Sequence, residues 1–328
     1  MSTESGLLDA FLLDGKGGAQ RLDWAGVSAW TPSHGVLWVN IDYSAPDAMR
    51  WLETESGIDP VSRDALVDAD PRPRAIAHGD ALMVIVRGIN QNQGSEPEDM
   101  ISVRVWAEPN RVITMRHRVS RSLKTLAADA EVGRGPRGAA DVVVQLVDRI
   151  VDHVVMRVDT LGDDIAASED LILSEKRGAD LRAHLADHRR RAIGLRRFLA
   201  PQREALTKLA SIPLPWLTAS ERQQVAESAD RMMRSIEELD SVRDRAAVTQ
   251  EEIASRMGEL TNQRLYVLSI ITAVFLPLGF VCSLLGVNVG GVPLQHSEWA
   301  FWALLALFVV GVAIQLWIFR RRGWIKRD

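Results

Sequence analysis

Cysteine is almost absent from this chain of 328 residues, because Cys282 is the only one. A single cysteine excludes a disulfide framework within the chain, and none is available for a zinc site in residues 1–264. A basic excess is also absent: the formal net charge is −4, so the composition does not favour nucleic acid as a partner. The first residues lack a basic region followed by an apolar stretch, so we expect no signal peptide.

Charged residues are missing from two stretches near the C-terminus, 265–285 and 299–319. Each stretch is about 21 residues long, which as a helix rising 1.5 Å per residue spans a hydrocarbon core of roughly 30 Å. Neither contains Asp, Glu, Lys, Arg or His. The sequence therefore predicts a multi-pass membrane protein with two transmembrane helices in contact with the lipid bilayer.

Basic residues indicate how these spans are oriented. The tail 320–328 carries Arg320, Arg321, Arg322, Lys326 and Arg327, whereas the loop 286–298 carries no Lys or Arg. Positive residues stay on the cytoplasmic side, so we expect an external loop and cytoplasmic N- and C-termini.

The polar part of the chain divides into two regions. Residues 1–138 contain apolar runs typical of strands at 35–42, 80–87, 100–106 and 111–116, with a short helix at 45–55. The short turns between the later runs predict a partly antiparallel sheet in a cytoplasmic α/β domain. The Gly-rich loop 133–138 is its predicted boundary, and a helical region follows over 139–264.

Helical spacing predicts helices at 141–174 and 179–198, and then one much longer helix. Thr218 and Glu221 form a capping-box pattern, and no proline follows until Pro277. We therefore expect one continuous helix over 219–285, with its last third in the membrane.

The cytoplasmic half of this long helix carries a coiled-coil-like seam of residues three and four apart. We interpret the seam as contact between copies of the chain around an axis; packing against other helices of the same chain is the alternative. Its members are Val225, Ala229, Met232, Ile236, Leu239, Arg243, Ala246, Gln250, Ile253, Met257, Leu260 and Arg264.

Small and hydroxyl-bearing residues also follow one face of the first span. Two helices cannot enclose an aqueous path, but several copies of one span around a symmetry axis can. The second span is apolar throughout and is predicted to face lipid. The pore-facing set in and beside the first span is Leu265, Leu268, Thr272, Leu276, Gly279, Ser283 and Gly286.

The motif around this span resembles the signature of the CorA family of divalent metal transporters. Thr261-Asn262-Gln, Phe275-Leu276-Pro277-Leu278-Gly279-Phe280 and Gly286-Val287-Asn288 match a pore helix that the family ends with Gly-Met-Asn. Val287 in place of Met, followed by Val289-Gly290-Gly291-Val292-Pro293, is similar to the zinc-transporting ZntB branch. The match covers about 35 residues, and the layout agrees over the whole chain.

The resemblance implies a homopentameric funnel in the bacterial cytoplasmic (inner) membrane that transports Zn²⁺, with no resident cofactor. Gly286, Val287 and Asn288 would form the external pore mouth, where Asn288 offers amide oxygens to a hydrated ion. Leu265, Leu268 and Leu276 match apolar constrictions, and Asn262 and Thr272 match polar pore positions. Coupling to protons is implied by the ZntB branch alone.

Other residues are weaker candidates for binding metal. His184 and His188 lie four apart on a predicted helix, a spacing that suits zinc but is more typical of a solvated helix face. His296 and Glu298 in the external loop are candidates for attracting cations, or are ordinary interfacial polar residues.

Two alternatives to zinc transport remain at this point. A Mg²⁺/Co²⁺ channel of the same family is the first, although Val287 and Gly279 depart from the magnesium pattern. A membrane-anchored cytoplasmic sensor or enzyme is the second. We predict that the protein is not an enzyme, because residues 1–200 contain no nucleophile elbow, phosphate loop or metal-ligand tetrad.

Overall fold

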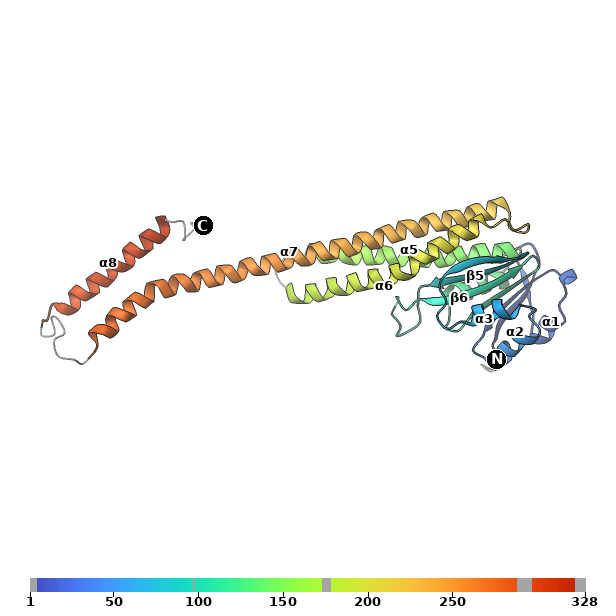
Figure 1. The fold of residues 1–328 in the computed structure, drawn as a ribbon, viewed down its shortest axis with the longest axis horizontal. Helices are drawn as coiled ribbons and strands as arrows, with labels where there is room; N and C mark the ends of the chain where they lie inside the picture. The colour runs from blue at the N-terminus through green and yellow to red at the C-terminus, as the bar shows by residue number, and fades with distance from the viewer. Residues whose placement is uncertain (1–4, 97, 173–177, 288–296, 322–328) are drawn as a thin grey trace. The chain divides into compact units, whose positions relative to one another are not determined.

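The computed structural model describes residues 5–96, 98–172, 178–287 and 297–321. The chain forms two compact units, Met1–Glu251 and Glu252–Asp328. The first unit is built on a sheet and the second on apolar helices (Figure 1).

A seven-stranded sheet forms the centre of the first unit, in the order β2-β1-β3-β7-β6-β5-β4. Strands β3 and β7 pair in parallel and the other neighbours pair antiparallel, which confirms the predicted partly antiparallel sheet. The central strands are apolar over most of their length because helices cover both faces of the sheet. The strands are β1 (Leu7–Leu13), β2 (Ala19–Arg21), β3 (Val36–Asp42), β4 (Arg74–His78), β5 (Ala81–Gly88), β6 (Ile101–Glu108) and β7 (Arg111–Arg116).

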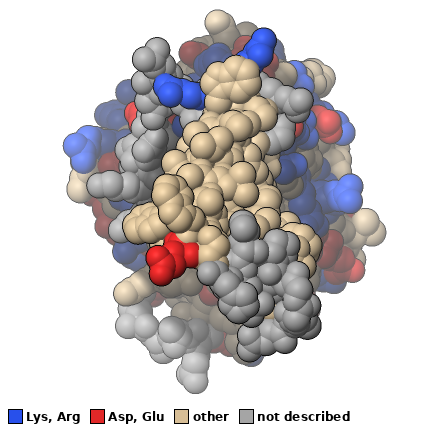
Figure 2. Space-filling model, turned by 90° about the vertical axis from the view of Figure 1, so that its left-hand side faces the viewer, with Lys and Arg blue, Asp and Glu red and all other residues tan. Residues whose placement is uncertain are grey.

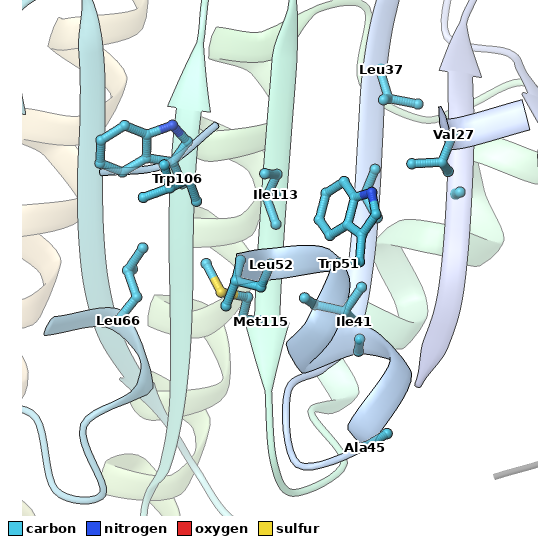
Figure 3. Close-up of a cluster of buried hydrophobic side chains, with 14 of the residues drawn as sticks. Val27, Leu37, Ile41, Ala45, Trp51, Leu52, Leu66, Trp106, Ile113 and Met115 are labelled. Atoms are coloured by element: carbon cyan, nitrogen blue, oxygen red, sulfur yellow. The ribbon is translucent and has the colours of Figure 1, made fainter. Parts of the chain in front are cut away.

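Short helices cover one face of the sheet. They are α1 (Trp24–Ser28), α2 (Pro46–Thr54) and α3 (Pro60–Val67), with one 3-10 turn at Pro32–His34. Trp51 and Leu52 of α2 and Leu66 of α3 lie against Ile113 and Met115 of β7 in one buried cluster (Figure 3). This cluster supplies much of the apolar burial that stabilises the domain.

Longer helices cover the opposite face: α4 (Arg121–Glu131), α5 (Ala139–Ile172) and α6 (Gly178–Ser211) (Figure 1). A buried polar contact joins α6 to the sheet, since the backbone N–H of Arg87 donates to Gln202 Oε1 at 2.6 Å. On the same face Trp38 Nε1 donates to Thr114 Oγ1 at 3.0 Å, so both of these buried side-chain atoms are paired.

Helix α7 runs without interruption from Ala219 to Leu285, as predicted. The capping box at its start is formed in both directions: the Thr218 N–H donates to Glu221 Oε2 at 2.7 Å, and the Glu221 N–H donates to Thr218 Oγ1 at 3.2 Å. Helix α8 (Ala300–Arg321) covers the second predicted span except its first residue, Trp299, and extends two residues beyond it.

The interpretation of the α7 seam as contact between copies is wrong over most of its length. Val225, Met232 and Leu239 are fully or almost fully buried within a single chain, and burial continues to Ile253. Arg245 of α7 forms a two-pronged ion pair with Glu169 of α5, with Nε to Oε1 at 3.1 Å. An apolar seam indicates that a helix partner exists but not which chain supplies it; here α5 and α6 of the same chain do.

Some boundaries also differ from the prediction. Helix α6 continues past Phe198 and through Pro201 to Ser211, because Leu206 and Leu209 are fully buried and tertiary packing outweighs the local cost of a proline. Strands β1 and β2, in the weakly patterned N-terminal stretch, were not predicted.

Candidate ion pathway

Helix α8 covers one face of the membrane segment of α7. Along α7 the partly buried positions recur three or four residues apart, and the corresponding positions on α8 do the same. This spacing is that of two helices packed along their length. The partly buried α7 set is Ile270, Ala273, Val274, Leu278 and Val281; the α8 set is Ala300, Leu304, Phe308, Val312 and Gln315, followed by buried Phe319.

The predicted pore-facing residues lie on the opposite face of α7. At 3.6 residues per turn their mean direction is roughly 180° from that of the α8-facing set. All are exposed within the single chain, and Leu276 reaches 70%. At Gly279 a Cβ would meet open space. The set consists of Asn262, Leu265, Leu268, Thr272, Leu276, Gly279 and Ser283.

A hydrogen bond that the sequence analysis missed holds α8 against α7. Pro277 has no N–H, so the carbonyl of Ala273, four residues earlier, loses its partner within the helix. Gln315 of α8 supplies the replacement, since its Nε2 donates to Ala273 O at 2.7 Å. Membrane helices tolerate proline when a neighbouring helix satisfies the freed carbonyl in this way. The signal in the sequence was that Gln315 is the only amide side chain in the second span.

The end of α7 lies at the predicted pore mouth. The Gly286 N–H donates to Cys282 O at 2.9 Å, and Val287 is exposed. Asn288 and His296 lie outside the described residues. Glu298, the other predicted loop residue, is exposed.

Figure 2 shows an uncharged band of side chains over the apolar helices. Both α7 and α8 contain windows apolar enough to cross a membrane, with mean hydropathies of 2.4 and 2.3. Charged atoms appear at the ends of the band and not within it, as a hydrocarbon environment requires.

The predicted metal pair, His184 and His188, lies on α6. His184 is exposed, whereas His188 is half-buried and its Nδ1 has no hydrogen-bond partner. Burial lowers the pKa of His188, although the nearby Asp164 and Asp187 oppose that shift. A neutral imidazole suits metal binding. However, the described residues contain no group of three or more His, Cys, Asp and Glu side chains that would complete a site.

Comparison with known proteins identifies the family. A family model described as CorA-like Mg²⁺ transporter protein matches residues 33–321. The chain belongs to the CorA family. The divalent cation transporter CmaX of Pseudomonas aeruginosa is 38% identical over 326 residues, which cover 98% of each chain. The zinc transport protein ZntB of Yersinia enterocolitica is 34% identical over 316 residues, covering 96% of this chain and 95% of ZntB.

Solved structures of CorA-family proteins share the fold over almost the whole chain. The structure of full-length CmaX aligns with a TM-score of 0.86 at 37% identity, covering 98% of this chain and 99% of CmaX. The CorA magnesium transporter from Methanocaldococcus jannaschii aligns with a TM-score of 0.82, covering 97% of this chain and 98% of that one. At 18% identity this second likeness concerns the fold alone.

These findings confirm the predicted fold class and the general function. This CorA-family protein transports divalent cations across the cytoplasmic (inner) membrane and is not an enzyme, since its relatives are named as transport proteins. A cytoplasmic α/β domain precedes the long helix, and two apolar helices end the chain.

The hydrogen bond between Gln315 and the Ala273 carbonyl generates a first prediction. Gln315→Leu should lower the free energy of unfolding in detergent by about 1 kcal/mol, since interhelical hydrogen bonds in membranes contribute about this much. In a Pro277→Ala background the same change should cost much less, because the restored N–H satisfies the carbonyl. An equal cost in both backgrounds would show that Gln315 does not act by replacing the missing N–H.

The two faces of α7 generate a second prediction, tested in a Cys282→Ala background. Cysteines at Thr272 and Ser283, on the exposed face, should react with a membrane-impermeant thiol reagent. Cysteines at Ala273 and Val281, on the α8-facing side, should react at least about tenfold more slowly, because lipid and protein exclude water from the thiolate. The measurement is the labelling rate in membrane vesicles. Faster labelling of the α8-facing pair would place the water path on the other face.

Proposed function

We propose that this CorA-family transporter carries Zn²⁺ through a pore on the axis of a homopentamer, lined by the exposed face of α7. The observation that supports the proposal most directly is the division of α7: α8 covers one face, and no described residue covers the face from Leu265 to Ser283. In a closed ring of copies, this exposed face would contact neighbouring copies and the water of the pore.

Zinc is favoured over magnesium by two features of the chain. The zinc transport protein ZntB is similar over nearly the full length, and Gly286-Val287-Asn288 departs from the Gly-Met-Asn motif. Mg²⁺ or Co²⁺ is the second candidate, because the matching family model is described by Mg²⁺ transport and CmaX is named only for divalent cations.

The chemistry of the exposed face suits an ion that keeps its water shell. Residues 265–285 contain no carboxylate, imidazole or other charged group that would replace the inner ligands of a divalent cation. The Asn288 amide oxygens would instead accept hydrogen bonds from water bound to the ion. Below them, the rings of Leu265, Leu268 and Leu276 would close the pore by excluding water. The polar Asn262 and Thr272 would stabilise water between and below these constrictions.

Coupling of zinc to protons, which the resemblance to ZntB implies, would use the same path. Because the first span contains no carboxylate or imidazole to relay a proton, protons would move through the water that fills the open pore. A pH gradient would then change zinc flux only when the pore is open.

Uptake of ⁶⁵Zn²⁺ into liposomes that contain the purified protein tests the proposed substrate. We expect zinc flux that increases with an imposed proton gradient and persists in excess Mg²⁺. Empty liposomes provide the control. Flux abolished by Mg²⁺ would assign the transporter to magnesium, and absence of zinc flux would refute the proposal.

Replacing the predicted pore-mouth amide tests the pathway itself. Asn288→Ala should reduce zinc uptake by roughly tenfold or more, because the ring of amide oxygens that accepts hydrogen bonds from the hydrated ion is lost. The oligomer should remain intact by native mass spectrometry. Ser297→Ala, in the same loop, should leave uptake unchanged. Normal flux through the Asn288 variant would remove this residue from the pore mouth.

A further inference from the structure

A cleft of about 300 Å³ lies in the cytoplasmic domain, at one edge of the sheet. Tyr43 follows the end of β3, while His117 and Arg118 follow the end of β7. Since β3 and β7 are parallel, their carboxyl ends meet at this edge. Arg87, near the end of β5, and Phe198 of α6 line the same cleft. Open sheets that carry helices on both faces commonly bind ligands at the carboxyl ends of their strands.

Two arginines in this cleft are almost completely buried. Arg104 is 2% exposed and Arg87 is 8% exposed. Each guanidinium lies over an aromatic ring, Arg104 at 4.6 Å from the Tyr43 centroid and Arg87 at 4.5 Å from that of Phe198. Stacking fixes the orientation of both cations but does not neutralise their charge.

The buried charge is only partly compensated. Arg87 forms an ion pair with Asp70, whereas Arg104 donates to the backbone carbonyl of Asp68 at 2.7 Å and has no carboxylate partner among the described residues. The Nε atoms of both arginines are buried without a hydrogen-bond partner. Burial lowers the pKa of Arg104, and Arg87 adds to that effect, whereas Tyr43 and the Asp68 carboxylate oppose it. An uncompensated buried cation is costly unless an anion accompanies it.

Exposed groups at the rim complete the cleft. Arg118 is exposed and forms no ion pair within the described part of the chain, so it is available to a ligand. Of the carboxylates, Asp70 is paired with Arg87. Glu98 lies 3.9 Å from Arg191 of α6, and its buried Oε2 has no hydrogen-bond partner among the described residues. Asp99 is exposed at the rim. The cleft is therefore lined by the uncompensated charges of Arg104 and Arg118, opposed by those of Asp99 and Glu98.

We propose that this cleft binds a small phosphorylated ligand, whose phosphate group is held by Arg104 and Arg118. Guanidinium groups match the geometry of phosphate oxygens and form strong charge-assisted hydrogen bonds with them. The volume suits a phosphate with a small organic group, at the lower limit of small-molecule sites. A divalent cation is disfavoured, because the buried Arg104 repels it and Asp70 is already paired with Arg87.

Bound ligand would act on the contact between the sheet and α6. Arg87 of β5 contacts α6 in two ways. Its guanidinium lies over the Phe198 ring, and its backbone N–H donates to Gln202 Oε1. A phosphate beside Arg104 would relieve repulsion between the two guanidiniums and so favour this packing. The site is independent of which cation is transported, because none of its residues belongs to the membrane segments.

Isothermal titration of the full-length protein in nanodiscs, with inorganic phosphate and with pyrophosphate as probes, tests the site. We expect saturable binding of at least one probe. Arg118→Ala should weaken that binding about tenfold, as expected for loss of one charged hydrogen bond. Asp99→Asn should strengthen binding two- to threefold, because it removes a repulsive charge whose effect water partly screens.

Arg50→Ala is the matched control, since Arg50 is an exposed arginine of α2 outside the cleft. Binding by this variant should equal that of the unaltered protein. Absence of saturable binding, or equal losses in the Arg50 and Arg118 variants, would overturn the proposal. Zinc binding that strengthens in Arg118→Ala and weakens in Asp99→Asn would identify a cation site instead.

Discussion

The packing of α7 against α5 and α6 is the contact on which the rest of the chain depends. From Val225 to Thr249 one face of α7 is buried in the first compact unit, and ion pairs such as Arg245 with Glu169 border that face. Apolar burial supplies most of the stabilisation, because half-exposed ion pairs contribute little each. Beyond Ile253 the seam residues Met257 and Leu260 are exposed. The seam of α7 is therefore buried up to Ile253 and exposed beyond it.

That change makes the membrane segment of α7 different from an ordinary anchor. A simple anchor needs only an apolar surface toward lipid, whereas this segment combines large apolar residues with Thr272, Gly279 and Ser283 on one side and a packed contact with α8 on the other. The exposed side of this segment carries no charged residue between positions 265 and 285. Selectivity among divalent cations would therefore depend on how each ion holds its water.

The sequence was most informative where a single local rule decided the outcome. The start of α7 followed from the Thr218 capping box, and its length followed from the absence of breakers before Pro277, through which the helix continues to Leu285. Strands β3, β5, β6 and β7 followed from their apolar runs and turns. Prediction failed where the structure depends on which residues pack together in three dimensions. The buried seam of α7 packs on α5 and α6 of the same chain. The cleft brings together Tyr43, Arg104 and Phe198, which are distant in sequence. The pore residues stay a prediction, and Asn288 lies outside the described residues.

The pairing of Pro277 with Gln315 has a consequence for how such chains vary. Pro277 in the first span leaves the Ala273 carbonyl without its usual donor. The Gln315 amide in the second span donates a hydrogen bond to that carbonyl instead, with Nε2 2.7 Å from the oxygen. Neither residue is advantageous alone, because an amide without the free carbonyl is a polar burden in lipid. Substitution at one position relaxes selection on the other, so the two should be retained or lost together among relatives, as a covarying pair that reports the contact between the two membrane helices.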